Sequence, residues 1–250
     1  MTAFYLPLGD DRYEPTDLTE SPWDTRMQHG GPPAALLARA MAPDDQRLTR
    51  LSVDFLAPIP RRPLSVEVTT IKPGRLTALR EARMVVDGKV AVVARGWHIA
   101  PGPEPSVVTP GEPQPPVPAG SDSGMDFFGY GRATDWHGLS GPLLSAEGHA
   151  DVWTRVNHPL VAGEALTGVA RTLIVADAAN GLSTNFDLKE WLSIPPGMAT
   201  TFLREPVGDW VRLACRTDVT ADGIGLCTGD LSDPGGRFAQ VTQPLLVRQR

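Results

Sequence analysis

The sequence has few cysteines and no long apolar run. Its two cysteines, Cys215 and Cys227, fall in predicted neighbouring strands, and we expect both to be buried and reduced rather than joined in a disulfide. No stretch approaches the roughly 20 apolar residues that a membrane-spanning helix requires, so we expect no membrane partner. The segment 1–17 is acidic overall and lacks the basic and apolar regions of a signal peptide. This favours a cytoplasmic protein.

Basic residues are also scarce, because 23 Lys and Arg oppose 29 Asp and Glu and give a formal net charge of −6. Nucleic-acid binding needs clustered cations that neutralise phosphates, so we expect no nucleic-acid partner. The five histidines show no metal-ligand spacing, and no phosphate-binding G-x-x-x-x-G-K-[ST] loop occurs. We therefore expect no metal and no cofactor. A G-x-S-x-G motif is missing as well, which disfavours an α/β-hydrolase.

Prolines and glycines dominate residues 100–120, APGPEPSVVTPGEPQPPVPAG. Proline fixes φ and lacks a backbone donor, so this stretch predicts an extended surface linker with polyproline II character. We predict an N-terminal half at residues 1–100, a linker at 101–125 and a C-terminal half at 126–250.

Each half is predicted to hold one helix followed by four antiparallel strands. The helices are expected at 30–42 and at 166–181, the second closed by Gly181. Alternating apolar residues predict strands at 48–60, 63–74, 76–88 and 89–99, and again at 198–207, 209–223, 224–236 and 237–247. An offset near 147 residues aligns Phe55 with Phe202, which indicates a duplicated domain. The pattern favours an α+β fold in which each curved sheet wraps around a helix.

One carboxylate interrupts the apolar run of the second predicted helix, LIVADAANG at 173–181. Asp177 is either a structural residue that helps Asn180 and Gly181 to end the helix, or a functional group. A carboxylate that loses hydration among apolar side chains becomes a better base for activating water.

Four short motifs resemble the thioesterase superfamily with the double hotdog fold, and in particular the bacterial acyl-CoA thioesterase II enzymes. They are HGG at 29–31, A-D-x-x-N-G-x-S at 176–183, REPVGDW at 204–210 and QVTQPLLV at 240–247. The resemblance implies two antiparallel sheets, each wrapped around a central helix and fused in one chain. It also implies hydrolysis of an acyl-CoA substrate, and a homodimer or higher homo-oligomer.

In that family a helix carboxylate, a last-strand Gln and an early-strand hydroxyl hold and polarise the attacking water. The resemblance implies that Asp177 and Gln243 take the first two roles. Thr200 is favoured for the hydroxyl, while Thr184, Asn185 and Thr201 stay open.

The start of the first helix is expected to bind the substrate through His29, Gly30 and Gly31. Free N–H groups at a helix N-terminus stabilise a developing negative charge, and glycine allows close approach. A turn or cap role for His29 also stays open. Arg61, Arg62 and Arg75 are candidates to meet the CoA phosphates.

Two other functions stay open. A hotdog protein that binds acyl-CoA or lipid without cleaving it is the main alternative. A hotdog enoyl-CoA hydratase is less favoured, because Asn157 and His158 are adjacent and Asp151 is poorly spaced from them.

Overall fold

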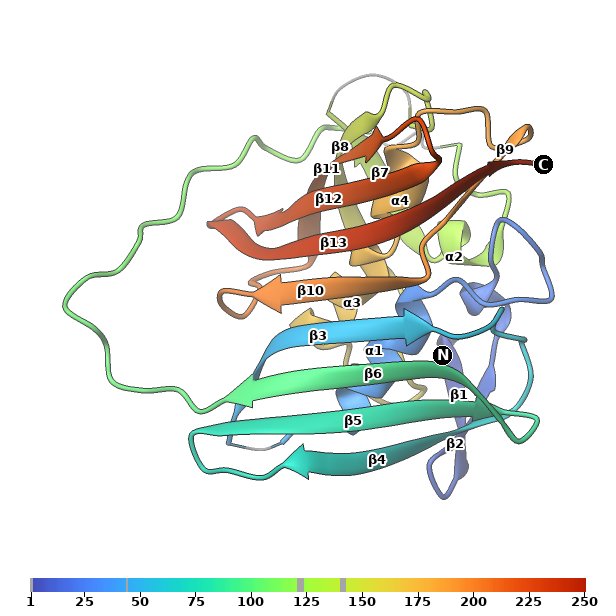
Figure 1. Cartoon of the computed structure of the whole chain (residues 1–250). Helices are drawn as coiled ribbons and strands as arrows, with labels where there is room; N and C mark the ends of the chain where they lie inside the picture. Colours follow the sequence, from blue (N-terminus) through green and yellow to red (C-terminus); the bar gives the residue numbers. More distant parts are fainter. Residues whose placement is uncertain (1, 44, 121–123, 140–142) are drawn as a thin grey trace.

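The computed structural model describes residues 2–43, 45–120, 124–139 and 143–250. In this part of the chain, thirteen strands form one sheet of antiparallel pairs that curves around the helices (Figure 1). The strands of the first half are β1 (Tyr5–Gly9), β2 (Arg12–Pro15), β3 (Arg47–Phe55), β4 (Leu64–Lys72), β5 (Thr77–Val86) and β6 (Lys89–Ile99). Those of the second half are β7 (Thr134–Gly138), β8 (His149–Val156), β9 (Trp191–Ile194), β10 (Gly197–Phe202), β11 (Trp210–Val219), β12 (Ile224–Asp233) and β13 (Gly236–Gln249).

The strand order is β1-β2-β4-β5-β6-β3-β10-β13-β12-β11-β8-β7, with β9 paired to β13. Its second half mirrors its first, and the two half-sheets join where β3 pairs with β10. Ser52 and Ala199, which are 147 residues apart, lie directly opposite each other at this seam. The predicted repeat therefore corresponds to an approximate two-fold axis between these two residues, and the sheets of the two hotdog halves form one continuous sheet.

Helices α1 (Gly31–Ala40) and α3 (Gly168–Ala176) pack against each other on the inner face of the sheet (Figure 1). Pro32 and Pro33 fit the first turn of α1, where a missing N–H costs least. Thr167 caps α3 by accepting a hydrogen bond from the Ala170 N–H. Apolar side chains from both helices are buried against the strands, as in a double hotdog.

The second predicted helix is interrupted. α3 ends at Ala176, and a short helix, α4, covers Ala179–Leu182. The Asn180 N–H binds the Gln243 side-chain oxygen instead of the Ala176 carbonyl that would continue the α-helix. The prediction that Gly181 closes the helix is wrong, because Gly181 lies inside α4 and does not have a positive φ.

Several short elements were not expected from the sequence. They are β1, β2, β7, β8, β9, a 3₁₀ turn η1 (Asp17–Thr19) and a helix α2 (Gly129–Arg132). Cys215 and Cys227 are buried free thiols on β11 and β12, as predicted. Of the predicted linker, residues 101–118 contain no helix or strand, and 121–123 lie outside the described residues.

Candidate active site

Asp177 lies at the joint between α3 and α4. Its side chain is 7% exposed, and the preceding Leu173, Ile174 and Val175 are fully buried. The apolar run thus buries the helix, while the carboxylate stands at its C-terminal end, where the α-helical hydrogen bonds are interrupted although the backbone keeps right-handed helical dihedrals. This position brings it to the boundary between the two halves.

The first half of the chain supplies His29 to this carboxylate. His29 Nδ1 lies 2.9 Å from Asp177 Oδ2, and the imidazole is 13% exposed. The His29 N–H donates to the Thr19 carbonyl at 2.7 Å, which ties this residue to η1. The Gly31 N–H points at the same Nδ1, with the two nitrogens 3.3 Å apart, and would donate to it if that nitrogen carried no proton. Because a protonated Nδ1 that donates to the carboxylate cannot also accept, the Gly31 N–H is then free for another acceptor.

The two glycines at the start of α1 allow the helices to meet. A Cβ on Gly30 would stand 2.6 Å from Phe55 Cζ and 2.9 Å from Asp177 Oδ2. A Cβ on Gly31 would stand 2.5 Å from the Ile174 carbonyl oxygen. The N-terminus of α1 is therefore packed directly onto the C-terminal end of α3, and any side chain there would separate them.

Gln243 reaches Asp177 from β13 and is fully buried. Its Nε2 lies 3.4 Å from Asp177 Oδ1, and its Oε1 accepts the Asn180 N–H at 3.0 Å. The backbone donor fixes which end of the amide faces α4, so the NH₂ group must face the carboxylate. The side chain of Asn180 is held in turn by two hydrogen bonds with Ser193.

Thr200 lies on the face of the sheet that carries Gln243. It stands opposite Val241 on β13, and side chains two residues apart on a strand share a face. Its hydroxyl is buried and has no hydrogen-bond partner among the described residues.

The other three candidates for the hydroxyl are placed differently. Thr201 is exposed on the opposite face of the sheet, Thr184 donates to the Phe186 carbonyl, and Asn185 donates to the Thr217 carbonyl. Thr200 therefore combines the shared face with a free hydroxyl.

Tyr130 of α2 belongs to the same cluster and was missed in the sequence. Its ring stacks on His29 with centroids 3.9 Å apart and planes 3° apart, and its hydroxyl donates to the Ile174 carbonyl at 2.9 Å. Burial, and the nearby charge of Asp177, raise the pKa of Tyr130 well above its usual value, so the phenol stays protonated and can donate. The aromatic sequence FFGYGR at 127–132 was the only local signal for it.

The remaining predicted polar residues lie apart from these contacts. Arg61 and Arg62 form ion pairs with Asp17 and Asp87 at 2.8 Å and 2.6 Å, while Arg75 is exposed. The Asn157 side chain binds Asp135, and the ring of His158 faces the Thr2 carbonyl.

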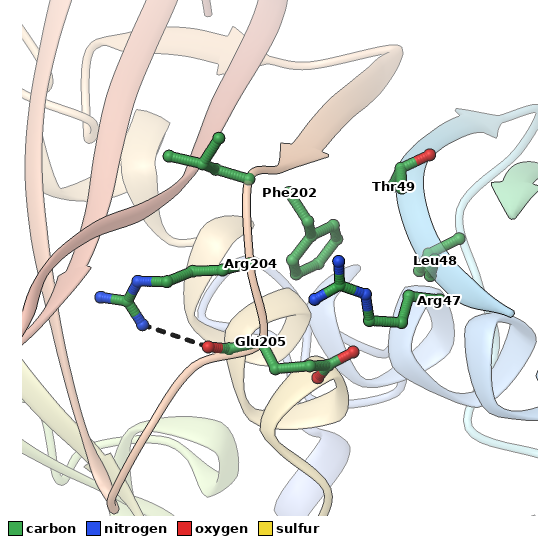
Figure 2. Close-up of a pocket in the computed structure, with 7 residues that line it drawn as sticks. Arg47, Leu48, Thr49, Phe202, Arg204 and Glu205 are labelled. Carbon is green, nitrogen blue, oxygen red and sulfur yellow. Dashed lines mark hydrogen bonds between the residues drawn. The ribbon is translucent and has the colours of Figure 1, made fainter. Parts of the chain in front are cut away.

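A small hollow of about 20 Å³ opens where β3 begins and β10 ends (Figure 2). Arg47 and Phe202 face each other across it, and Arg204 donates to the Glu205 carbonyl. Phe202 is the two-fold counterpart of Phe55, so this hollow is the counterpart of the region where Phe55 meets Gly30. Arg204 is bound to a buried carboxylate, Asp233, and is not available to a ligand.

Two family models match this chain. The acyl-CoA thioesterase N-terminal domain covers residues 19–99, and the acyl-CoA thioesterase C-terminal domain covers residues 107–247. The chain belongs to the acyl-CoA thioesterase family. None of the curated proteins matches it in sequence.

Solved structures agree with the double hotdog fold of this acyl-CoA thioesterase family member. A conserved hotdog-fold protein of unknown function from Alicyclobacillus acidocaldarius is 16% identical with a TM-score of 0.76, over 97% of this chain and 95% of that one. An acyl-CoA thioesterase II from Mycobacterium marinum is 17% identical with a TM-score of 0.71, over 98% and 96%. Likeness at this identity shows the shared fold. In the described residues no helix has the length and apolarity to cross a membrane.

Proposed function

We propose that this member of the acyl-CoA thioesterase family hydrolyses the thioester of an acyl-CoA, with Asp177 and Gln243 holding the attacking water. The observation that carries the proposal is the contact between the Asp177 carboxylate and the Gln243 amide, 3.4 Å apart across 66 residues of sequence. A water that donates to Asp177 Oδ1 and accepts from the Gln243 amide would be both oriented and activated.

Thr200 completes the water site in this proposal. Its buried hydroxyl lacks a partner, and a buried polar group without a partner is costly unless a water or ligand binds it. A water between these groups would satisfy the hydroxyl and offer its oxygen lone pair to a substrate.

The start of α1 is proposed as the substrate-binding element. The Gly31 N–H, once the protonated His29 Nδ1 donates to Asp177, is free to bind the thioester oxygen as it gains negative charge. His29 lies beside this N–H.

The reaction would run as follows. The water oxygen attacks the thioester carbon while one water proton passes to Asp177. The C–S bond then breaks, and the CoA sulfur leaves as a thiolate that takes up the proton from Asp177. A carboxylic acid and free CoA result, and the carboxylate is restored.

The test measures, with a thiol reagent, the release of free CoA from a panel of acyl-CoA thioesters of increasing chain length. Asp177→Asn keeps the shape of the side chain and removes the base, so we expect kcat to fall by about 10²–10⁴-fold. Asp218→Asn is the matched control, because Asp218 is 62% exposed and lies outside the site. Tight binding of acyl-CoA by the wild-type protein without CoA release would contradict hydrolysis and support the alternative, a binding module.

We also propose a cytoplasmic homodimer or higher homo-oligomer. Three partly exposed apolar side chains, Ile194, Leu246 and Ile224, lie side by side across β9, β13 and β12 and would be covered by a second copy. Light scattering on the purified protein would measure the mass, and a monomer at micromolar concentration would contradict this proposal.

A further inference from the structure

Four residues from three separate segments form a closed ring of contacts around the carboxylate. Asp177 Oδ2 contacts His29 Nδ1, the His29 ring stacks on Tyr130, and the Tyr130 hydroxyl donates to the carbonyl of Ile174. Ile174 lies in α3, three residues before Asp177, which directly follows the last residue of that helix. The cycle of contacts therefore closes on the segment that carries the carboxylate.

We propose that His29 and Tyr130 are positioning residues for the Asp177 carboxylate, an inference that rests on the hydrolysis proposed above. The last torsion of an Asp side chain is broad, so packing alone does not fix where its two oxygens point. A donor on Oδ2 fixes the carboxylate plane, and Oδ1 is then directed to the Gln243 amide and the proposed water.

The ring stack has a separate effect, because it fixes the plane of the imidazole. An imidazole that can rotate would move its Nδ1 proton away from the carboxylate. Tyr130 cannot follow such a rotation, since its hydroxyl is held by the Ile174 carbonyl. The two ring nitrogens of His29 point in opposite directions, so a neutral ring that donates from Nδ1 presents an unprotonated Nε2 on the other side.

A single turn places both residues. The Thr19 carbonyl of η1 accepts the His29 N–H, and the carboxylate of the next residue, Glu20, accepts the Gly129 N–H at the start of α2. A Cβ on Gly129 would lie 1.6 Å from the Asp17 carbonyl oxygen, so α2 is packed directly on η1. The segment that follows the predicted linker therefore contributes to the site through Tyr130 of α2.

Three variants separate the donor from the stack. His29→Phe keeps a ring for Tyr130 and removes the donor, and we expect kcat to fall about 10²-fold with KM within about threefold, as for a misplaced catalytic group. His29→Asn offers an amide donor near the place of Nδ1. It should recover at least about a tenth of the kcat that His29→Phe loses. Tyr130→Phe keeps the stack, frees the ring from Ile174 and should lower kcat by several-fold only.

The second measurement does not depend on activity. In the wild-type protein, proton NMR with ¹⁵N-labelled histidine should show a hydrogen-bonded His29 Nδ1 proton that exchanges slowly with water. It should vanish in Asp177→Ala, and it should exchange faster in Tyr130→Leu, which lacks the ring. Thermal unfolding of each variant reports whether it folds.

The outcomes separate the two proposals. Wild-type CoA release that is unchanged in His29→Phe, or a wild-type protein without the Nδ1 signal, would overturn the positioning role while hydrolysis by Asp177 stands. A wild-type protein that shows the signal but cleaves no acyl-CoA would instead reject hydrolysis, and with it the positioning role that serves it. If His29→Phe fails to fold, the signal in wild type and its fate in Asp177→Ala decide the matter.

Discussion

A carboxylate at the C-terminal end of a helix faces the negative end of the helix dipole, which is unfavourable by itself. Asp177 occupies this position at the end of α3. Donors from His29 and Gln243, together with the positive N-terminal end of α1 beside it, offset the unfavourable dipole. The charge is therefore stabilised by groups that α3 does not supply, and it depends on the contact between the two helices.

Substitution of Gly30 tests that contact. In Gly30→Ala the new methyl group would overlap the Phe55 ring and crowd Asp177 Oδ2, so we expect a loss of about 1–3 kcal/mol in the free energy of unfolding, with lower CoA release. Denaturant titration measures the first effect. Gly102→Ala is the control, because its Cβ would meet nothing within 4 Å. Equal stability of the two variants would show that α1 and α3 can separate without cost.

A second buried carboxylate, Asp233, predicts a pH dependence of stability. Burial raises its pKa, but hydrogen bonds from Arg204 and from the N–H groups of Val207 and Gly235 outweigh burial and lower it. A carboxylate with a lowered folded-state pKa stabilises the protein above its unfolded-state pKa, and this contribution is lost as the pH falls through the folded-state value.

We therefore expect Asp233→Asn to cost about 3 kcal/mol at pH 7, since it leaves Arg204 without its charged partner. The difference from wild type should shrink as the pH is lowered below 4. Urea titrations between pH 7 and pH 3 measure it. A difference that stays constant over this range would assign the loss to packing rather than to charge.

At the scale of the element, α3 is capped by Thr167 at its N-terminal end and is followed by Asp177 at its C-terminal end. Thr167 accepts the Ala170 N–H at 3.1 Å and satisfies one of the free donors of the first turn. We expect Thr167→Ala to lower the free energy of unfolding by about 1 kcal/mol, and Thr167→Ser to preserve it, because serine keeps the accepting oxygen. Thermal unfolding compares the two. An equal loss in both variants would indicate that the threonine methyl group matters more than the cap.

At the scale of the whole molecule, the two halves share a sheet but do not contribute equally to the site. The two-fold relation that pairs Ser52 with Ala199 also relates Val53 to Thr200 and Gly96 to Gln243. The first half thus has an apolar side chain and a glycine where the second half has the hydroxyl and the amide. Each chain is accordingly proposed to have one site, with polar groups from the second half and a helix N-terminus from the first.

The seam between β3 and β10 should couple the stabilities of the halves. Leu51 is fully buried and lies opposite Thr200 on the seam, so we expect Leu51→Ala to cost about 2–5 kcal/mol. If the halves unfold together, amide hydrogen exchange should accelerate in β5 and in β12 alike. Faster exchange in β5 alone would show that the halves unfold separately.

The sequence was sufficient for elements defined by local patterns. Alternating apolar residues predicted β3 to β6 and β10 to β13, although β3 and β10 each end five residues before the predicted end, and the apolar small-residue runs predicted α1 and α3. The short strands β1, β2, β7 and β9 have too few residues for a periodic pattern. The division at residues 1–100, 101–125 and 126–250 stays a prediction.

The candidate site, like the fold, was predicted from the sequence only in part. The sequence, through the family resemblance, singled out Asp177, Gln243, Thr200 and the glycines of α1, whose roles remain predictions. The break after Asp177, the His29 contact and the place of Tyr130 depended on the tertiary structure. Periodicity reflects burial within one segment, whereas these features are set by hydrogen bonds and ring contacts between residues dozens of positions apart, which no local pattern specifies.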